Sequence, residues 1–319
     1  MIDDDGWALG SWVKIDGGHT ITRARGLSDE ECVRIRASMR RLRGFSGHAI
    51  LGPLVDSLNQ LTETLDEMLT VAPSTFNHGA FRSRLNGRMS SALTSFSGFR
   101  AAVEQHVRDL ALPTPSSAPE NFRTLYASHP SYRLVHMLRN LDQHRPPASA
   151  VLAVSKDEDP ETGAPRSRPT IDVLATVERC AAESSNAKYR VQWEQCGALW
   201  RGQAELVDVR ELFRAAYAAC ETVLAAHLNE AEPWILRDAY FIAGLVAEVE
   251  PLGSAHALRV ARDESGKMAN IEDIHLSALT FGEALATLDA ARRILGKCSV
   301  AEDDPSPAPA DPASTRSTG

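Results

Sequence analysis

Apolar residues recur at helical spacing through much of the first half of the chain. Ser28 and Glu31 form a capping-box pattern, which predicts that a helix begins at Ser28. A second helix is predicted from Leu54 to Val71, because leucines stand three or four positions apart along one face. Further helices are predicted over 81–112, over 119–129 and, after a break at Pro130, over 131–144. Such a succession is typical of a helical bundle.

The pattern is less regular on either side of this region. Residues 1–26 are expected to be irregular or weakly stranded, with a turn and a short strand within 15–23. After Pro147, apolar runs at 149–157 and 168–177 flank a polar turn and predict a β-hairpin. The pattern of residues 188–200 fits neither type clearly. The rest is assigned as helices over 207–229, 233–250 and 273–296, a strand and turn within 256–271, and a disordered Pro/Ala/Ser/Asp-rich tail over 301–319.

These elements predict a mainly α fold, in which a helical bundle carries a small β-hairpin insertion and additional C-terminal helices. Residues 27–300 are expected to form a single helical domain, preceded by the irregular segment 1–26. Within it, residues 27–147 form the bundle, and residues 148–300 contribute the β insertion and helices packed on the bundle. No repeat of 20–50 residues and no clear linker interrupts this arrangement.

Composition is that of a globular protein. Of 319 residues, 43% are hydrophobic and 24% are charged. The N-terminus is acidic and lacks an apolar run, and no uninterrupted apolar stretch approaches the length of a membrane span, so we expect neither a secretory signal nor a membrane segment. The five cysteines are scattered and never spaced as CxxC. They indicate a cytoplasmic protein whose cysteines pack as small hydrophobic residues.

Charge is unevenly distributed. The net charge of −8 argues against a protein that coats nucleic acid indiscriminately. Residues 1–145 hold 17 Lys and Arg against 15 Asp and Glu, a net of +2, whereas residues 146–319 hold 17 against 27, a net of −10. Every cationic residue between Lys14 and Lys156 is an arginine, the side chain suited to forked phosphate contacts. A solvated arginine-rich surface and a local phosphate-binding face both fit this pattern.

Most motifs of catalytic chemistry are absent. The chain has no phosphate-binding P-loop, no GxGxxG, no GxSxG and no HExxH. His129, His136 and His144 lie seven and eight residues apart, but only Asp142 is near them, so we expect surface or core histidines and neither a metal nor a cofactor. Tryptophans among aliphatic residues are interpreted as core or interface anchors: Trp193, Trp200 and Trp234.

One short segment combines polar groups at a helix end. In "LRNLDQHRPP" an apolar helix acquires Arg139, Asn140 and His144 and then meets Pro146, which predicts that the helix ends near His144. An arginine that precedes a histidine with four to six residues between them is not informative alone. The chain has five such pairs, among them Arg123 with His129. Asn140 and His144 are four residues apart and can touch, so the amide can fix the tautomer of the imidazole.

The segment "RNLDQH", residues 139–144, resembles the signature of HEPN domains. The resemblance covers these six residues and the helices around them. It implies a helical bundle that dimerises and brings the Arg and His of both chains together as a metal-independent ribonuclease. The residues that match are Arg139, Asn140 and His144. The HEPN toxins that a partner nucleotidyltransferase modifies carry a tyrosine two residues after the histidine, where this chain has Pro146.

Two functions follow as hypotheses. The first is an endoribonuclease that cleaves RNA through the 2′-OH, in defence or stress, with Arg139 contacting phosphate, His144 carrying the proton, Asn140 orienting the imidazole and Arg145 as a weaker substrate contact. It would act as a homodimer, because each chain offers one Arg/His set, and an inhibitor or regulator protein is a further expected partner. The alternative is a non-catalytic helical module that binds RNA or a protein, in which the same residues only complete a helix end.

Overall fold

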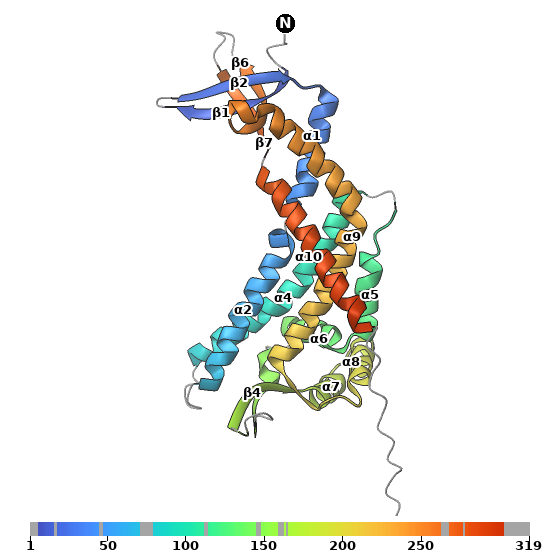
Figure 1. Cartoon of the computed structure of the whole chain (residues 1–319). Helices are drawn as coiled ribbons and strands as arrows, with labels where there is room; N and C mark the ends of the chain where they lie inside the picture. The colour runs from blue at the N-terminus through green and yellow to red at the C-terminus, as the bar shows by residue number, and fades with distance from the viewer. Residues whose placement is uncertain are drawn as a thin grey trace, which may run out of the picture.

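The computed structural model describes residues 6–15, 18–44, 47–70, 79–111, 114–144, 148–158, 163, 165–262, 268–276 and 278–302. The molecule is mainly helical and elongated, with a small antiparallel sheet at each end (Figure 1). Helix α9, Val209–Val249, runs between the two sheets. Its 41 residues span about 60 Å at 1.5 Å per residue. The mainly α prediction is confirmed.

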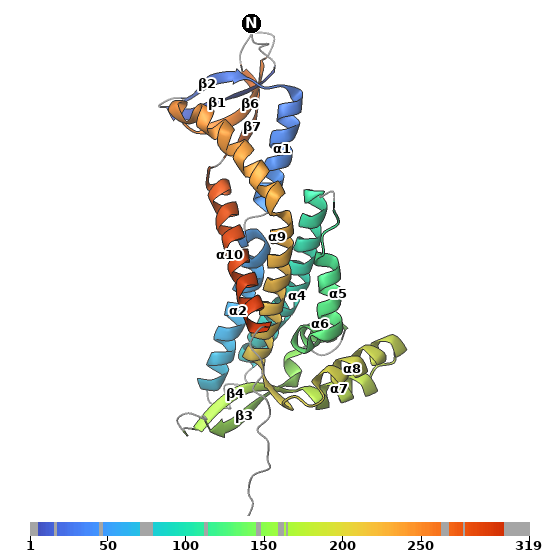
Figure 2. The ribbon, with the colours of Figure 1, turned by 45° about the vertical axis from the view of Figure 1, so that its right-hand side comes forward.

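The central bundle is built on α9. Helices α2 (Gly47–Thr70) and α4 (Gly79–Leu110) pair with each other, and α6 (Pro130–His144) lies between α4 and α9 (Figure 2). Apolar side chains along α4 recur every three or four residues and are buried, as the sequence pattern predicts. The remaining helices of this region are α1 (Asp29–Gly44) and α5 (Ala118–Ser128).

Helix α9 is continuous, so the prediction of separate helices over 207–229 and 233–250 is wrong. Pro233 lies inside the helix. A proline inside a helix removes one hydrogen bond between residues i and i−4, and its ring clashes with the carbonyl of residue i−4. Ala231 and Ile235, on either side, are buried in the core, and their packing holds the helix through that position. The C-terminal helix α10, Ala278–Glu302, packs along α9.

The N-terminal segment forms two strands, so the short strand predicted within 15–23 is confirmed, whereas the irregular structure expected for the rest of the segment is wrong for residues 7–15. Strand β1 (Trp7–Ile15) pairs with β2 (Gly18–Gly26) and with β6 (Ala255–Arg262). Strand β7, Met268–His275, completes a sheet in the order β2-β1-β6-β7. Residues 273–275 thus belong to a strand, and the final helix begins later than predicted. The pairing of β1 with β6 joins distant parts of the chain, which local patterns cannot reveal.

A second sheet forms at the other end of the molecule. Strand β3 (Leu152–Glu158) pairs with β4 (Pro165–Asp172), which confirms the predicted hairpin, and the short β5 (Leu206–Asp208) joins β4. The strand predicted over 168–177 is wrong beyond residue 172. There the Asp172 carboxylate accepts a hydrogen bond from the Ala175 backbone N–H at 2.9 Å and begins α7, Val173–Ala182.

The segment of unassigned type, residues 188–200, is helical. It belongs to α8, Ala187–Trp200, which forms a helical hairpin with α7 beside the second sheet (Figure 2). Short 3₁₀ turns precede β3 at Ala148–Val151 and follow α9 at Glu250–Leu252. None of the helices in the described part of the chain is long and apolar enough to cross a membrane. Of the tail predicted to be disordered, residues 301–319, the first two residues belong to α10, and residues 303–319 lie outside the described residues.

The cysteines and two of the tryptophans behave as predicted. Cys32, Cys180, Cys196 and Cys220 are buried free thiols, and burial raises the pKa of Cys196 to about 12. Trp193 and Trp200 of α8 are buried in the core. Trp234 is half-buried and carries the guanidinium of Arg237 over its ring, at 4.7 Å from the centroid.

Candidate functional site

Helix α6 is centred in the bundle and ends at the candidate motif. Its start is capped by His129, whose Nδ1 accepts a hydrogen bond from the Tyr132 backbone N–H at 3.3 Å. Its middle is buried, with Leu134 and Leu138 fully covered by neighbouring helices. The helix ends at His144, as the sequence predicts from Pro146. The motif residues are therefore held at the end of a rigid element of the core.

Arg139 and Asn140 are both half-buried. The Arg139 guanidinium donates from Nη1 to the Asn140 side-chain carbonyl at 3.4 Å, a long hydrogen bond to a neutral partner. The Nε of Arg139 is buried and has no hydrogen-bond partner among the described residues. The Arg139 guanidinium is thus partly removed from water and has no carboxylate partner among the described residues. The side chains of His144 and Arg145 lie outside the described residues, so the approach of Arg139 to His144 stays a prediction.

Arg133, an earlier arginine of α6, also has a buried Nε without a partner among the described residues, but the rest of its guanidinium reaches three acceptors. The buried Arg133 of α6 donates to the Tyr126 carbonyl at 3.0 Å, to the Gln192 carbonyl at 3.3 Å and to the Gln195 side chain at 2.8 Å. Those contacts tie α6 to α5 and α8. Arg139, one and two-thirds turns later, has no comparable set of acceptors. Its position is not explained by helix packing alone.

Two further residues border Arg139 and were not selected from the sequence. Arg100 of α4 and His136 of α6 line the same small hollow as Arg139. His136 stands three residues before Arg139 and so lies on the same face of α6. Burial, followed by the charges of Arg100, Arg139 and Arg133, lowers the pKa of His136 to about 4. The His136 imidazole is therefore neutral at pH 7, which leaves the positive charge here to the arginines.

The sequence indicates that His136 and Arg139 lie close together, but it does not indicate that Arg100 joins them. The spacing of His136 and Arg139 was visible, although His136 was interpreted as a surface or core histidine. Arg100 comes from another helix, and only the packing of α4 against α6 brings it near. Its guanidinium also donates from Nε to the Glu104 carboxylate at 2.8 Å. Arg139 is consequently the arginine of the hollow that lacks an anionic partner among the described residues.

A larger cleft opens beside Asn140. It has a volume of about 270 Å³ and lies between the end of α6 and the α7–α8 hairpin. Asn140 and Leu141 form its α6 side, and Ser184, Asn186, Tyr189 and Trp193 line the opposite side. Asn140 thus links Arg139 to the cleft, because its side-chain carbonyl accepts a hydrogen bond from Arg139 and the residue also lines the cleft.

The equally spaced pair Arg123 and His129 has an ordinary structural explanation. The Arg123 side chain is 70% exposed and forms an ion pair with Glu120 at 2.6 Å on the same helix. His129 caps α6, as described above. Arg123 and His129 therefore have structural roles that explain them, unlike Arg139, and the spacing alone did not reveal this difference.

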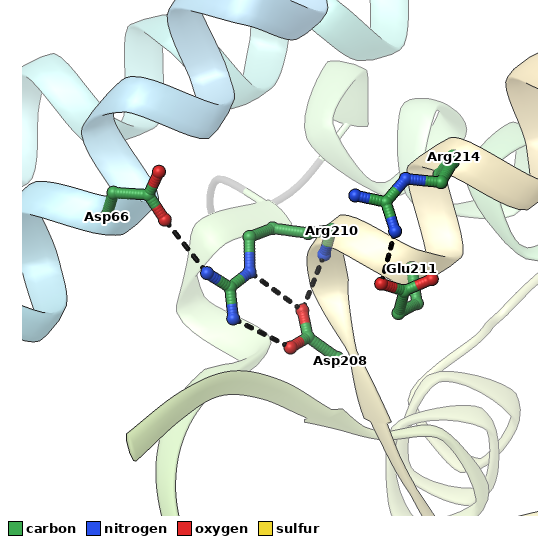
Figure 3. A network of polar contacts seen from close by, with 5 residues as sticks. All are labelled: Asp66, Asp208, Arg210, Glu211 and Arg214. Carbon is green, nitrogen blue, oxygen red and sulfur yellow. Dashed lines mark hydrogen bonds and ion pairs between the residues drawn. The ribbon is translucent and has the colours of Figure 1, made fainter. Parts of the chain in front are cut away.

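A network of polar contacts lies at the start of α9 (Figure 3). Arg210 holds the Asp208 carboxylate with two prongs, at 3.2 and 2.9 Å, and reaches Asp66 of α2 at 2.8 Å. Burial alone would raise the pKa of Asp208, but the hydrogen bonds from Arg210 outweigh burial and lower it. Asp208 also caps α9 by accepting from the Arg210 backbone N–H at 2.8 Å. Arg210 thus joins α2, β5 and α9, and its donors are taken by the two carboxylates.

A buried histidine pair links α4 and α9. His106 Nδ1 lies 2.9 Å from His227 Nε2, and His227 Nδ1 lies 2.9 Å from the Ser116 hydroxyl. That hydroxyl donates to Glu230 at 3.0 Å. Burial is the main cause that lowers the pKa of each histidine to about 4. Sequence patterns gave no sign of this pair, because its members are 121 residues apart.

Metal ligation has no candidate here. Among the described residues, no three His, Cys, Asp or Glu side chains converge into a group that can hold a metal ion. Comparison of the whole chain with protein families, with curated proteins and with solved structures gives no match.

Proposed function

We propose that the chain is a metal-independent endoribonuclease of the HEPN type, acting on RNA in the cytoplasm. The observation that carries the proposal is Arg139, a half-buried guanidinium near the end of a core helix whose Nε lacks a partner among the described residues. A cation in that setting gains most from an anionic ligand. A phosphate diester suits it, because its oxygens match the planar fork of arginine.

RNA suits the site because RNA supplies its own nucleophile. The 2′-OH attacks the adjacent phosphorus and loses its proton to one His144 imidazole. The 5′ oxygen of the next nucleotide leaves with a proton from the His144 of a second copy. The products are a 2′,3′-cyclic phosphate and a free 5′-OH. Each proton transfer contributes on the order of 10²–10⁴ in rate, and Arg139 stabilises the charge that grows on the phosphorane oxygens.

His136 does not replace His144 in this scheme. A general base works best with a pKa near the working pH. Burial and the neighbouring arginines hold the pKa of His136 near 4, so its imidazole is too weak a base at pH 7. His144, at the helix C-terminus, is favoured in its protonated form by the helix dipole. Because each chain supplies one such residue, the proposal requires a homodimer.

Purified full-length protein should cleave single-stranded RNA in EDTA and leave DNA of the same sequence intact. His144→Ala should abolish cleavage, and Arg139→Lys should be severely impaired, since an ammonium cannot reproduce the two-pronged contact. Asn140→Ala should lower the rate less. Arg123→Ala is the matched control and should cleave like wild type. Normal cleavage by the His144 and Arg139 variants, or a strictly monomeric active protein, would refute the proposal.

The second candidate is a non-catalytic module that binds RNA or a protein partner. The observation that favours it is the cleft beside Asn140, which is large enough for a small ligand and is lined by no His, Asp, Glu, Lys or Arg side chain. Under this alternative the protein binds RNA, but no variant or condition yields a cyclic phosphate end. The same cleavage assay, read beside a binding assay on the same RNA, separates the two functions.

A further inference from the structure

The cleft between α6 and the α7–α8 hairpin has the chemistry of a nucleobase site. Its lining contains no charged side chain. Tyr189 and Trp193 supply aromatic walls, and the amide groups of Asn140 and Asn186 supply hydrogen-bonding edges. An uncharged, flat heterocycle with donors and acceptors on its rim fits this combination, whereas a phosphate or a charged peptide side chain does not.

The size of the cleft limits the ligand to a small group. Its volume of about 270 Å³ is just below the range of roughly 300–1,000 Å³ that is typical of drug-sized ligands. One base fits that space, and a stacked pair of nucleotides does not. Trp193 is almost fully buried and forms part of the core. Tyr189 is half-buried, so its ring is the aromatic face of the two that remains open to a ligand.

The edges of the cleft retain hydrogen-bonding capacity. Asn186 caps α8 through its side-chain carbonyl, which accepts from the Lys188 backbone N–H at 2.9 Å and leaves the amide NH₂ for other contacts. The side-chain carbonyl of Asn140 accepts from Arg139, and this is the one side-chain hydrogen bond of Asn140 within the described part of the chain. The Asn140 NH₂ is therefore available to an acceptor atom on a base.

Asn140 places this cleft next to the phosphate-binding group. It follows Arg139 directly and contacts its guanidinium, while its side chain also lines the cleft. In RNA, each base likewise lies next to the 3′-phosphate of its own nucleotide, so one nucleotide can reach both the cleft and Arg139. We propose that the cleft holds one unstacked nucleobase of single-stranded RNA, with the phosphate of that nucleotide at Arg139. This inference rests on the proposed ribonuclease function and adds base selectivity to it.

The test uses full-length His144→Ala protein in EDTA and labelled ten-nucleotide homopolymers of each base, read by fluorescence anisotropy. One homopolymer should bind more tightly than the others. Adding Tyr189→Ala should weaken that binding about 5- to 150-fold, which corresponds to about 1–3 kcal/mol per stacked base, and should remove the preference. Tyr189→Phe should keep it, because the ring face is retained.

Tyr240→Ala is the matched control. Tyr240 is exposed in the last third of α9, the end of the helix that leads into β6 of the other sheet, so its loss should not alter RNA binding. Circular dichroism of each variant checks that it is folded. Tyr189-dependent base selectivity without cleavage by the wild type would support the base site and overturn the ribonuclease. Cleavage with an unchanged base preference in Tyr189→Ala would overturn the base site alone, and no binding of any homopolymer would overturn both.

Discussion

Acid should destabilise this protein through the buried pair His106 and His227. Both side chains are covered, at 3% and 0% exposure. The Ser116 hydroxyl donates to the Glu230 carboxylate, so the His227 Nδ1–H donates to Ser116 and the His106 Nδ1–H donates to His227 Nε2. Each imidazole is then neutral with one proton. Protonating His227 would set two N–H groups against each other at 2.9 Å inside the core.

The sign of the effect follows from the two pKa values. The pKa of each histidine is about 4 in the folded protein and about 6.5 in the unfolded chain. The unfolded state therefore binds more protons between pH 6.5 and 4, and the free energy of unfolding falls as pH is lowered through that window. At 1.36 kcal/mol per pH unit, the loss by pH 5 is about 2 kcal/mol for each histidine. Glu230 and Asp109 raise the two pKa values, but less than burial lowers them.

A loss of about 4 kcal/mol is a large part of the 5–15 kcal/mol that is typical of a folded protein. The perturbation is the double variant His106→Gln/His227→Gln, and the assay is urea unfolding followed by circular dichroism from pH 5 to pH 8. The measured quantity is the difference in unfolding free energy between pH 7.5 and pH 5, rather than stability at one pH. The double variant should lose about 4 kcal/mol of that difference, and His227→Gln alone about half.

The control is Thr64→Val, which removes a buried hydroxyl that donates to the Gln60 carbonyl at 2.9 Å. It carries no titrating group, so it should change stability equally at every pH. His129 and His136 also have lowered pKa values, but they are present in all of these proteins and cancel in the comparison. If the double variant shows the same difference between pH 7.5 and pH 5 as wild type, the reasoning about the pair is wrong.

Two further predictions contrast a structural arginine with the candidate functional one. Asp238→Ala should lower the unfolding free energy by roughly 3–5 kcal/mol, because Asp238 is buried, holds the guanidinium of Arg41 with two prongs and accepts from Ser38. Arg139→Met should change it by no more than about 0.5 kcal/mol or raise it, because the replacement removes a poorly satisfied cation and forfeits only the 3.4 Å contact with Asn140. Urea unfolding at pH 7.5 measures both, and a large loss in the Arg139 variant would assign that residue to the fold.

Local signals predicted the helices and failed where distant segments meet. The capping box at Ser28 and Glu31 is confirmed in both directions, at 3.1 and 2.9 Å, because all of its atoms lie within four residues. The long α4 was predicted to within two residues at each end for the same reason. In contrast, β1 is a strand largely because β2 and β6 pair with it, and β6 begins more than 200 residues later. Without that partner the first 26 residues carry only a weak pattern.

The same limit applies to the candidate site, where the parts formed by one helix were predictable and the parts formed by two helices were not. Arg139, Asn140 and the end of α6 were predictable, since they depend on one helix and the prolines after it. The hollow shared with Arg100 and the cleft shared with Tyr189 were not, because each needs a second helix packed on α6. The α7–α8 hairpin was the least legible part of the sequence. Residues 188–200 are buried at intervals that fit a helix, but exposed polar residues and two tryptophans obscure the period.

The arginines of the fold differ in how many acceptors they reach. Arg41 has a buried carboxylate, Arg210 has the buried Asp208 and the exposed Asp66, and Arg133 has three neutral acceptors, although its Nε, like that of Arg139, has no partner among the described residues. Each of them ties together helices that would otherwise be held by apolar contact alone. Partial burial of the Arg139 guanidinium costs free energy of desolvation, and the guanidinium forms one long hydrogen bond, to Asn140, among the described residues. The phosphate that we propose as a ligand would supply Arg139 with the acceptors that the described residues do not, and the Arg139→Met variant separates that role from a role in the stability of the fold.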